Sequence, residues 1–400
     1  MQNNKIFICN YWWNCNNYGA LLTAFAINKL VENSYLVNDL RINFYKAINK
    51  KYDFSYPFKR DFLKTEDIKE MYLNLEKLND ISNTFITGSD QVFRGGTIYD
   101  GRLSQYFLDF VKPDKKKIAF SASFGVDKEQ FLKETSKETI EKMKNSLKSF
   151  DFISVREKSG IEICNDIFNV DAEWIIDPVF ILDKCNYDDL IKNASNSYKN
   201  KIVAYTLDTS KEYKKAYKYL SKKYNKKVIE TANSNISVEN WLKSIRDCDL
   251  FLTDSFHGMC FAIIFNKPFI CISNKSRGGT RFNSICEMLD IKNQCIDSIN
   301  EIYKINCIFE IEYEKVNSKI EKERQKGLNL LKTALETPTQ ITQEKIDSRN
   351  KYLVNRIIEL ENQNNLNFQL KRWLWYKWLI TFHNLPEFIK SFIQYLRGKR

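Results

Sequence analysis

The sequence predicts an α/β protein in which two doubly wound parallel-sheet domains, Rossmann-like in topology, face a cleft. Short segments rich in β-branched and aromatic residues alternate with amphipathic helical segments, which indicates parallel sheets covered by helices. The 400 residues are too many for one ordinary domain and enough for two cores. A hydrophobic content of 43% with 28% charged residues is typical of a folded globular chain.

The order of these segments defines the predicted elements. Strands are predicted at residues 5–10, 83–87, 117–121, 152–155, 173–176, 201–207, 227–230, 249–253 and 268–273. Helices are predicted at residues 20–31, 128–150, 159–167, 211–223, 238–247, 259–266 and 281–290. The lysine- and leucine-rich sequence from 60 to 80 predicts a helical surface insertion. The domains are expected at 1–190 and 191–335, followed by a helical tail at 336–400.

Composition limits the partners and the compartment. The formal net charge of +12 favours phosphorylated, nucleotide-linked or anionic-membrane partners, although a Lys/Asn/Ile-rich composition explains much of it. No nucleic-acid partner is indicated. No signal peptide opens the chain and no run reaches the ~18 apolar residues of a membrane span. Ten cysteines without a CxxC pair, with only two histidines, indicate reduced thiols in a cytoplasmic protein and no metal site.

The composition of the tail changes abruptly at Arg372. From Lys371 onward Trp, Phe and Tyr residues are interleaved with lysines and arginines. This pattern is typical of an interfacial membrane anchor and would place the protein peripherally on the inner face of the plasma membrane through residues 371–400. The alternative is a terminal helix pair that packs on the main body, with the aromatic residues as packing residues.

The most informative motif is the polar segment 253–258, which separates an apolar strand from an apolar helix. It contains His257, one of two histidines in the chain. A strand-to-helix turn points backbone N–H groups and the positive end of the helix dipole at the ligand crevice. An imidazole beside such a site suggests acid–base chemistry on a negatively charged substrate. The alternative is a histidine that caps the helix or hydrogen-bonds a neighbouring loop.

Nearly every predicted strand ends in a polar or glycine-containing cluster. The clusters are residues 14–19, 87–91, 121–125, 154–157, 177–178 and 254–258. Ligands bind at the carboxyl ends of strands in open parallel sheets, so the clusters predict one composite site drawn from both domains. Ordinary strand-to-helix turns would also use Gly, Ser and Asp, but they do not explain Arg156 or His257.

Individual residues have alternative interpretations. Asp90 is either a helix cap or a ligand and base for a hydroxyl group. Arg156 offers a planar fork for a carboxylate or phosphate, or it forms a salt bridge with Glu157 or Asp177. Arg281 follows a glycine-containing turn and either reaches over the cleft or is exposed to solvent. The predicted catalytic residues are His257, Asp90 and Arg156. The predicted substrate-binding residues are Asn17, Tyr18, Gly19, Gly88, Ser89, Gln91, Ser123, Gly125, Asp254, Ser255, Gly258 and Arg281.

Taken together, the motifs resemble the polysaccharide pyruvyl transferase family. They are, in order, NNYGALLTAFAINKL, TGSDQVF, YFLDF, SASFG, SVREKSG, IIDPVFIL and TDSFHGMCFAIIFNKPFI. The resemblance runs from about residue 5 to 290 and leaves out 340–400. It implies a two-domain, glycosyltransferase-B-like fold and a transferase that moves a pyruvyl group from phosphoenolpyruvate to a sugar of a surface polysaccharide or its precursor, forming a ketal.

The resemblance also implies roles for residues. His257 would be the acid or a hydrogen-bond donor to phosphate, Arg156 and Arg281 would clamp anions, and Asn17, Asp90 and Gln91 would contact the sugar. The first domain would bind the acceptor and the second the donor, with no cofactor other than the co-substrate phosphoenolpyruvate. Many members carry an arginine two residues before the histidine, where this chain has Ser255, so donor binding would depend on Arg156 or Arg281.

Two other functions fit the same sequence. A glycosyltransferase of polysaccharide biosynthesis would bind the diphosphate of a nucleotide-sugar donor at the helix beginning near His257. A non-catalytic scaffold of a polysaccharide assembly complex would bind neither donor. In the enzymatic alternatives the acceptor sugar is lipid-linked, nucleotide-linked or polymeric.

Overall fold

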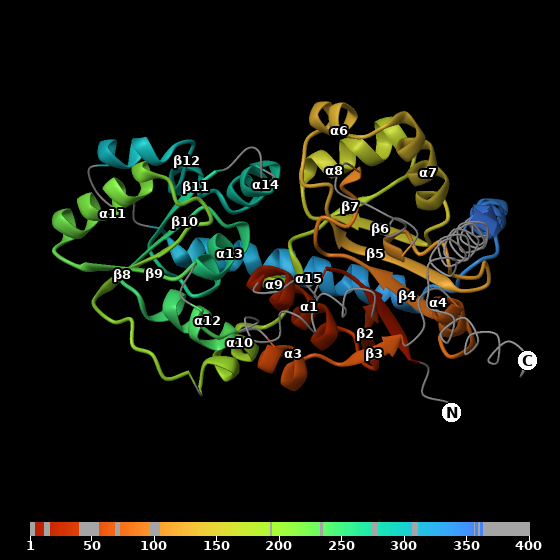
Figure 1. Ribbon diagram of the computed structural model, residues 1–400, viewed down its shortest axis with the longest axis horizontal. Helices are drawn as coiled ribbons and strands as arrows, with labels where there is room; N and C mark the ends of the chain where they lie inside the picture. Colours follow the sequence, from red (N-terminus) through yellow and green to blue (C-terminus); the bar gives the residue numbers. More distant parts are fainter. Residues whose placement is uncertain are drawn as a thin grey trace, which may run out of the picture. The chain divides into compact units, whose positions relative to one another are not determined.

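The computed structural model describes residues 5–11, 17–39, 56–68, 73–95, 105–192, 194–232, 235–273, 279–305, 311–355, 357–358 and 361–362. Tertiary contacts divide the chain into two units, Met1–Ser348 and Arg349–Arg400. Both sheets that the described residues form belong to the first unit (Figure 1).

The first sheet contains seven parallel strands in the order β3-β2-β1-β4-β5-β6-β7. Its strands are β1 (Ile6–Cys9), β2 (Ser34–Asp39), β3 (Thr65–Ile68), β4 (Thr84–Thr87), β5 (Lys116–Ala122), β6 (Phe152–Val155) and β7 (Glu173–Trp174). Every residue of β5 is buried, as expected for an inner strand of a sheet with both faces covered. The strand order reverses between β1 and β4, so the ligand crevice of this sheet is expected beyond the ends of these two strands.

The second sheet contains five parallel strands in the order β12-β11-β10-β8-β9. Its strands are β8 (Lys201–Tyr205), β9 (Lys227–Glu230), β10 (Leu250–Thr253), β11 (Phe269–Ile272) and β12 (Cys295–Ile296). Its order reverses between β8 and β10, and β10 leads directly into the segment that contains His257. The two sheets therefore confirm the predicted fold class of two doubly wound domains.

Helices connect the strands. They are α1 (Tyr18–Leu30), α3 (Tyr56–Phe62), α4 (Leu73–Lys77), α6 (Lys128–Glu134), α7 (Lys137–Leu147), α8 (Lys158–Ile163), α9 (Pro178–Ile181), α10 (Lys184–Ile191), α11 (Lys211–Tyr224), α12 (Val238–Asp247), α13 (Phe256–Ile264), α14 (Gly279–Leu289) and α15 (Tyr313–Glu336). A π-helical turn at Cys164–Phe168 extends α8, and residues 343–355 are also helical.

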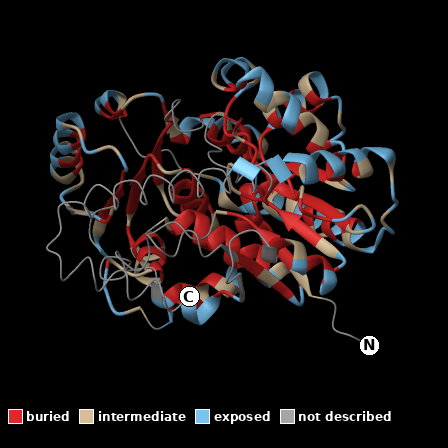
Figure 2. Cartoon of the chain, turned by 45° about the vertical axis from the view of Figure 1, so that its right-hand side comes forward, coloured by how far each residue is buried: buried red, intermediate tan, exposed pale blue. Residues whose placement is uncertain are grey.

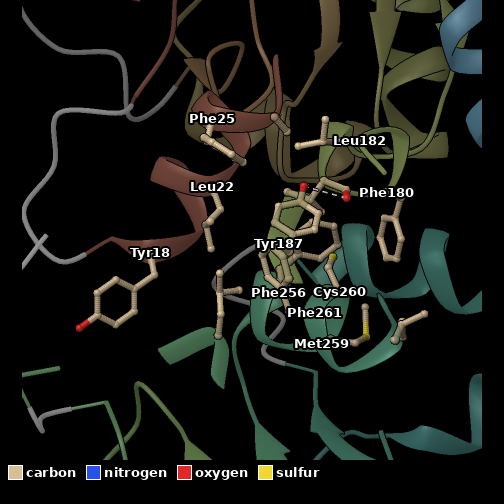
Figure 3. Close-up of a cluster of buried hydrophobic side chains, with 14 of the residues drawn as sticks. Tyr18, Leu22, Phe25, Phe180, Leu182, Tyr187, Phe256, Met259, Cys260 and Phe261 are labelled. Carbon is tan, nitrogen blue, oxygen red and sulfur yellow. Dashed lines mark hydrogen bonds between the residues drawn. The ribbon is translucent and has the colours of Figure 1, made fainter. Parts of the chain in front are cut away.

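One apolar core continues from the first sheet to the second. Helices α1, α9 and α13 contact one another, and α1 and α13 are almost entirely buried. Tyr187 of α10 joins these helices: its ring centre lies 6.3 Å from that of Phe25 of α1 and 5.0 Å from that of Phe261 of α13, and its hydroxyl donates to the Val179 carbonyl of α9 (Figure 3). Figure 2 shows buried residues in the strands of both sheets and in the helices between them. The ends of these helices are consequently held at fixed positions relative to one another.

Helix α15 follows the second sheet and returns to the first. At its beginning the Tyr313 hydroxyl donates to the Lys267 carbonyl. In its middle Arg324 Nε donates to the Ile181 carbonyl at 3.0 Å, and Gly327 packs against the Ile181 side chain. Near its end the Leu335 carbonyl accepts from the Lys116 ammonium group. The chain therefore crosses between the two sheets twice.

Two predicted elements differ from the structure. The helix predicted at 128–150 is divided into α6 and α7, because Thr135 is extended and Ser136 caps a new helix by accepting from the Thr139 N–H. The predicted helical insertion at 60–80 contains the edge strand β3, which pairs with β2 in parallel. Strands β2, β3 and β12 were not among the predicted strands. The predicted limits of β6, β9 and α12 are confirmed.

Three predictions are not tested by these observations. The domain limits at 190 and 335 stay predictions, as does membrane contact through residues 371–400, which lie outside the described residues. In the described part of the chain, no helix has the length and apolar character needed to cross a membrane.

Candidate active site

The candidate site forms where the carboxyl ends of strands lead into helices of both halves. Asn17 caps α1 by accepting from the Ala20 N–H at 3.2 Å, and Asp177 caps α9 by accepting from the Val179 N–H at 3.1 Å. Ser255 caps α13, since its hydroxyl accepts from the Gly258 N–H at 3.3 Å. Because α1, α9 and α13 pack together, these capped ends present polar groups to a shared region.

His257, the second residue of α13, makes its polar contacts with the first half of the chain. Its Nε2 atom lies 3.0 Å from Thr23 Oγ1 and 3.7 Å from Asp177 Oδ2. Its Nδ1 atom faces the backbone of Gly19, so closely that a Cβ atom there would lie 2.2 Å away. Only 7% of the residue is exposed. The ring orientation is therefore fixed by residues of α1 and by the beginning of α9.

Asp177 is a fully buried carboxylate that joins His257 to Arg156. Its Oδ2 atom accepts from Arg156 Nη1 at 2.8 Å. Burial would raise the pKa of Asp177, but the His257 imidazole and the Arg156 charge outweigh burial and lower it from 3.8 to about 2. Asp177 is thus ionised at neutral pH and can orient the imidazole and stabilise its protonated form.

Arg156 is buried among three carboxylates. Besides Asp177, its guanidinium lies 3.2 Å from Asp90 Oδ1 and 3.9 Å from Glu157 Oε2. Burial alone would lower the pKa of Arg156, but the charges of Asp177, Asp90 and Glu157 raise it above its usual value. Of the alternatives for Arg156, the structure contains the salt bridge to Asp177.

Asp90 and Glu157 are themselves held by backbone groups. Asp90 Oδ1 accepts from the Gln91 N–H at 2.8 Å, and Glu157 Oε1 accepts from the N–H groups of Phe124 and Gly125 at 2.6 and 3.0 Å. Burial would raise the pKa of Asp90, but the charges of Arg156, His257 and Arg281 lower it. The loops after β4 and β5 thereby fix the positions of both carboxylates.

Arg281 brings a second guanidinium to the site. Its Cζ atom lies 5.0 Å from the centre of the Phe256 ring, and that of Arg156 lies 5.1 Å from the same ring. Burial and the neighbouring Arg156 charge lower the pKa of Arg281 to about 10. Arg281 is therefore buried rather than exposed to solvent, and it is positively charged at neutral pH. We call Asp90, Arg156, Glu157, Asp177, His257 and Arg281 the charge cluster.

Several buried polar atoms next to the charge cluster have no hydrogen-bond partner among the described residues. They are Ser89 Oγ, Ser123 Oγ, Arg156 Nε and Glu157 Oε2. Buried polar atoms are normally satisfied by protein, water or ligand. Among the described residues, these four atoms could therefore accept or donate hydrogen bonds to a ligand bound at the charge cluster.

A cavity of about 550 Å³ lies between the two halves. It is lined by Arg94, Gly125, Val126, Asp127 and Gln130 of the first half and Ser273, Gly279, Thr280, Asn283 and Asp297 of the second. Its volume is in the range of about 300–1,000 Å³ that is usual for small-molecule sites. Gly125 connects it to the charge cluster, because the N–H of Gly125 donates to Glu157. No residue of the charge cluster lines the cavity, and the two are neighbours through Gly125.

Several other predicted site residues form hydrogen bonds or packing contacts with other residues of the protein. The Tyr18 hydroxyl donates to the Ile236 carbonyl at 2.6 Å and its ring packs against Trp241. Asp254 accepts from the N–H groups of Leu207 and Asp208. Three further positions serve packing or pairing: Gly88 lies against the Phe120 carbonyl, Gly258 against the Thr253 hydroxyl, and Gln91 accepts from Arg94.

Four residues of the site were not predicted as such: Thr23, Glu157, Asp177 and Phe256. Asp177 and Glu157 were visible in the strand-end clusters, but no pattern paired them with His257 or with the backbone of the loop after β5. Phe256 adjoins His257 in the motif, and its role beside two arginines depends on the three-dimensional arrangement. Thr23 lies inside an apolar helix and gave no signal.

Two doubly wound parallel sheets, with polar groups gathered at the carboxyl ends of their strands, define a two-domain α/β protein of the glycosyltransferase-B-like class. A family model for polysaccharide pyruvyl transferase matches residues 17–276, which is more than half of the chain. The chain belongs to this transferase family, as the motifs predicted.

The chain is similar to solved structures of two proteins that are named for nucleotide-linked sugars. UDP-GlcNAc 2-epimerase from Neisseria meningitidis, bound to UDP-GlcNAc, is 9% identical, with 89% of this chain and 100% of that chain covered and a TM-score of 0.46. ADP-heptose LPS heptosyltransferase II from E. coli is 9% identical, with 80% and 99% covered and a TM-score of 0.31. A sequence search of curated proteins finds no match.

Proposed function

We propose that the chain transfers a pyruvyl group from phosphoenolpyruvate to two hydroxyl groups of a sugar in a surface polysaccharide or its precursor, forming a ketal and releasing phosphate. Family membership supports a pyruvyl transferase. The observation that carries the proposal is the position of His257, held by Asp177 and Thr23 beside two buried arginines. This arrangement combines a general acid with groups that stabilise negative charge.

The reaction begins with proton transfer from His257 to the methylene carbon of phosphoenolpyruvate, which makes C2 electrophilic. One sugar hydroxyl attacks C2 and loses its proton, and the C2–O bond to phosphate breaks. The second hydroxyl then attacks C2 and loses its proton, which closes the ketal. One hydroxyl proton restores the histidine and the other leaves on phosphate. Asp177, ionised at neutral pH, stabilises the imidazolium that begins the cycle.

The nitrogen that exchanges the proton is Nδ1. Nε2 faces Thr23 and Asp177, and no described residue hydrogen-bonds Nδ1. Gly19 allows the ring to take this position because it has no side chain, since a Cβ atom there would lie 2.2 Å from Nδ1. Gly19 therefore contributes to the site by its lack of a side chain, which lets the His257 ring pack against its backbone, and not by a polar group.

We assign Arg281 to the donor because it brings a second buried guanidinium to the Phe256 ring, which lies next to His257. Arg156 already neutralises Asp177 and Asp90 through short contacts of 2.8 and 3.2 Å. Ser255, at the position where many members of the family carry arginine, uses its hydroxyl to cap α13. Arg281 reaches the same ring of Phe256 from α14 and would supply positive charge from another direction. We assign it the carboxylate or phosphate of phosphoenolpyruvate.

The cavity beside the charge cluster suits the sugar acceptor. Gln130, Thr280 and Asn283 offer uncharged donors and acceptors, and Asp127 and Asp297 are carboxylates that disfavour a highly charged anion. Arg94, the cation in the lining, is paired with Glu134 through contacts of 2.8 and 3.1 Å. A hydroxyl-rich, uncharged sugar matches this lining better than phosphoenolpyruvate does.

The proposed function is tested by the products of each donor. Purified protein is incubated with an acceptor glycan and either phosphoenolpyruvate or a nucleotide sugar. We expect inorganic phosphate from phosphoenolpyruvate, a glycan heavier by one pyruvylidene group in mass spectrometry, and no nucleotide release. Nucleotide release from a nucleotide sugar instead would show that the chain is a glycosyltransferase. Failure of both donors to bind in a thermal-shift screen would support a non-catalytic scaffold.

The role given to Gly19 can be measured separately. A Cβ atom at Gly19 would lie 2.2 Å from Nδ1 and 2.5 Å from Cγ of His257, so Gly19→Ala must displace the ring. A misplacement of this kind typically costs about 10²-fold in rate, and we expect that loss in phosphate release per folded molecule. Gly327→Ala on α15 is the matched control, because its Cβ atom would also meet a side chain closely, Ile181 Cδ1 at 2.5 Å. Equal rates for the two variants would contradict the assignment.

A further inference from the structure

Three cysteine thiols and one thioether gather in the second half of the chain. Cys271 is on β11, Cys295 is on β12 and Cys286 is on α14. The Sγ atoms of Cys286 and Cys295 are 2.9 Å apart, and Cys295 Sγ lies 3.8 Å from Sδ of Met259 on α13. Elements β12, α13 and α14 therefore meet at the Cys295 sulfur. The proposed reaction gives none of these sulfur atoms a role.

The sheet register brings a further thiol to Cys295. Cys271 and Cys295 are directly paired across the parallel strands β11 and β12. Side chains that are paired in this way point to the same face of a sheet. Cys286 reaches Cys295 from α14, which is a separate element. Cys295 is consequently the shared neighbour of two other thiols.

The three thiols differ in their access to solvent. All of them are free thiols, and Cys271 and Cys286 are 0% and 3% exposed, whereas Cys295 is partly exposed. A small oxidant can therefore reach Cys295, and Cys286 is in place to react with the oxidised product. The 2.9 Å between the two Sγ atoms is less than about 1 Å longer than a disulfide bond. A small movement of the side chains is enough to form that bond.

We infer that Cys286 and Cys295 form an oxidation site that converts between a dithiol and a disulfide, with hydrogen peroxide as the oxidant. The Cys295 thiolate attacks one peroxide oxygen and the O–O bond breaks, which gives a sulfenic acid and a hydroxide that takes up the thiol proton. The Cys286 sulfur then attacks the Cys295 sulfur, and the S–O bond breaks as water leaves with the Cys286 proton. The two thiols lose two electrons and the peroxide gains them.

The surroundings of the pair make this oxidation slow. The hydrogen bond to Cys295 and burial raise the pKa of Cys286. A hydrogen bond to Cys271 and burial raise the pKa of Cys295, against an opposing contribution from Cys286. Because the thiolate is the form that reacts, both groups react slowly at neutral pH. The site therefore records sustained oxidation rather than a brief exposure to peroxide.

The disulfide would fasten α14 to β12, the strand at one edge of the second sheet. Helix α14 carries Arg281 in its first turn and lines the cavity with Thr280 and Asn283. Oxidation thus acts on a helix that the candidate site uses, although the bond involves no residue of the charge cluster or of the cavity lining. The inference does not depend on the proposed function, because its test is the chemical state of the thiols.

The first experiment maps the disulfide in the full-length protein. Native protein is treated with hydrogen peroxide, and the remaining thiols are blocked with N-ethylmaleimide in denaturant. Trypsin places Cys286 in peptide 282–292 and Cys295 in peptide 293–304, so their disulfide joins two peptides that dithiothreitol separates. We expect this crosslinked pair to form while circular dichroism shows a folded protein. If both thiols stay open to blocking, or carry only sulfinic or sulfonic acid, the inference is overturned.

The second experiment identifies the partner of Cys295 with two matched variants. Cys286→Ala and Cys271→Ala each remove one buried thiol beside Cys295. We expect Cys271→Ala to form the same crosslinked pair as the wild type and Cys286→Ala to lose it. Cys271 lies in tryptic peptide 247–275, so a disulfide from Cys271 to Cys295 has a different mass. If that disulfide is the main product in the wild type, which requires neither variant to fold, the assignment to Cys286 is wrong.

Discussion

Replacement of His257 by glutamine is expected to lower phosphate release from phosphoenolpyruvate by about 10²–10⁴-fold, the range that general acid–base catalysis contributes. A glutamine amide can still hydrogen-bond Thr23, which lies 3.0 Å from Nε2, but it cannot supply a proton to the donor. The loss should appear mainly in kcat, because the two arginines that would bind the anion are unchanged. The measurement is the initial rate of phosphate release with a saturating acceptor.

The other histidine of the chain is the natural control. His383 is near the C-terminal end of the sequence, outside the matched family region, and His383→Gln should keep the rate of the wild type. Unfolding by urea should have the same midpoint in the wild type and in His383→Gln. If His257→Gln released phosphate at the wild-type rate, another group would have to be the acid.

Replacement of Arg156 by methionine should have the largest effect on stability. Methionine removes a buried charge and leaves Asp177, Asp90 and Glu157 without their shared partner. Removal of one member of a buried ion pair typically costs about 3–5 kcal/mol, and we expect a decrease of that size in the free energy of unfolding. Arg60→Met is the control, since the Arg60 side chain is 64% exposed, and it should change stability by less than about 0.5 kcal/mol.

The effect of pH distinguishes electrostatic loss from poor packing of the new methionine. In the wild type the pKa of Asp177 is about 2, below the usual 3.8, so its ionisation adds stability above pH 4 that is lost as the pH falls toward 2. Without Arg156 this contribution is smaller, because only the part of the lowering that comes from His257 and the Val179 N–H remains. The difference in stability between the wild type and Arg156→Met should therefore narrow as the pH falls through this window. A difference that is constant with pH would indicate packing alone.

The fold was predictable where a polar capping residue stands at the end of a helix or strand. Helix α12 begins after Ser237, whose hydroxyl accepts from the Asn240 N–H, and both its limits were predicted. Strand β3 was not predicted, because Thr-Glu-Asp-Ile has no strand pattern and is extended through its pairing with β2. The division between α6 and α7 was not predicted, because the amphipathic pattern continues across it. The new helix begins where the Ser136 hydroxyl accepts from the Thr139 N–H, and the apolar pattern does not show this local contact.

The candidate site was predictable as a set of residues and not as a set of contacts. Strand ends identified Asp90, Arg156 and His257, because parallel strands bring their carboxyl ends to one edge. Thr23 contacts His257 although 234 residues separate them in the sequence. Single-sequence patterns are local and contain no information on which helix beginnings meet. The same limit applies to Gly19, whose importance arises from the absence of a side chain.

Helix α15 has a consequence for how the two halves can move. A simple hinge between two domains is a single crossing of the chain, about which one part can rotate freely. Here Tyr313 bonds to the second half and Leu335 to the first, so one continuous helix spans both. Any opening that separates His257 from Asp177 must bend this helix or break its bonds at one end. A long helix remote from the chemistry therefore limits how far His257 and Asp177 can separate, and we expect only small movements between the two halves.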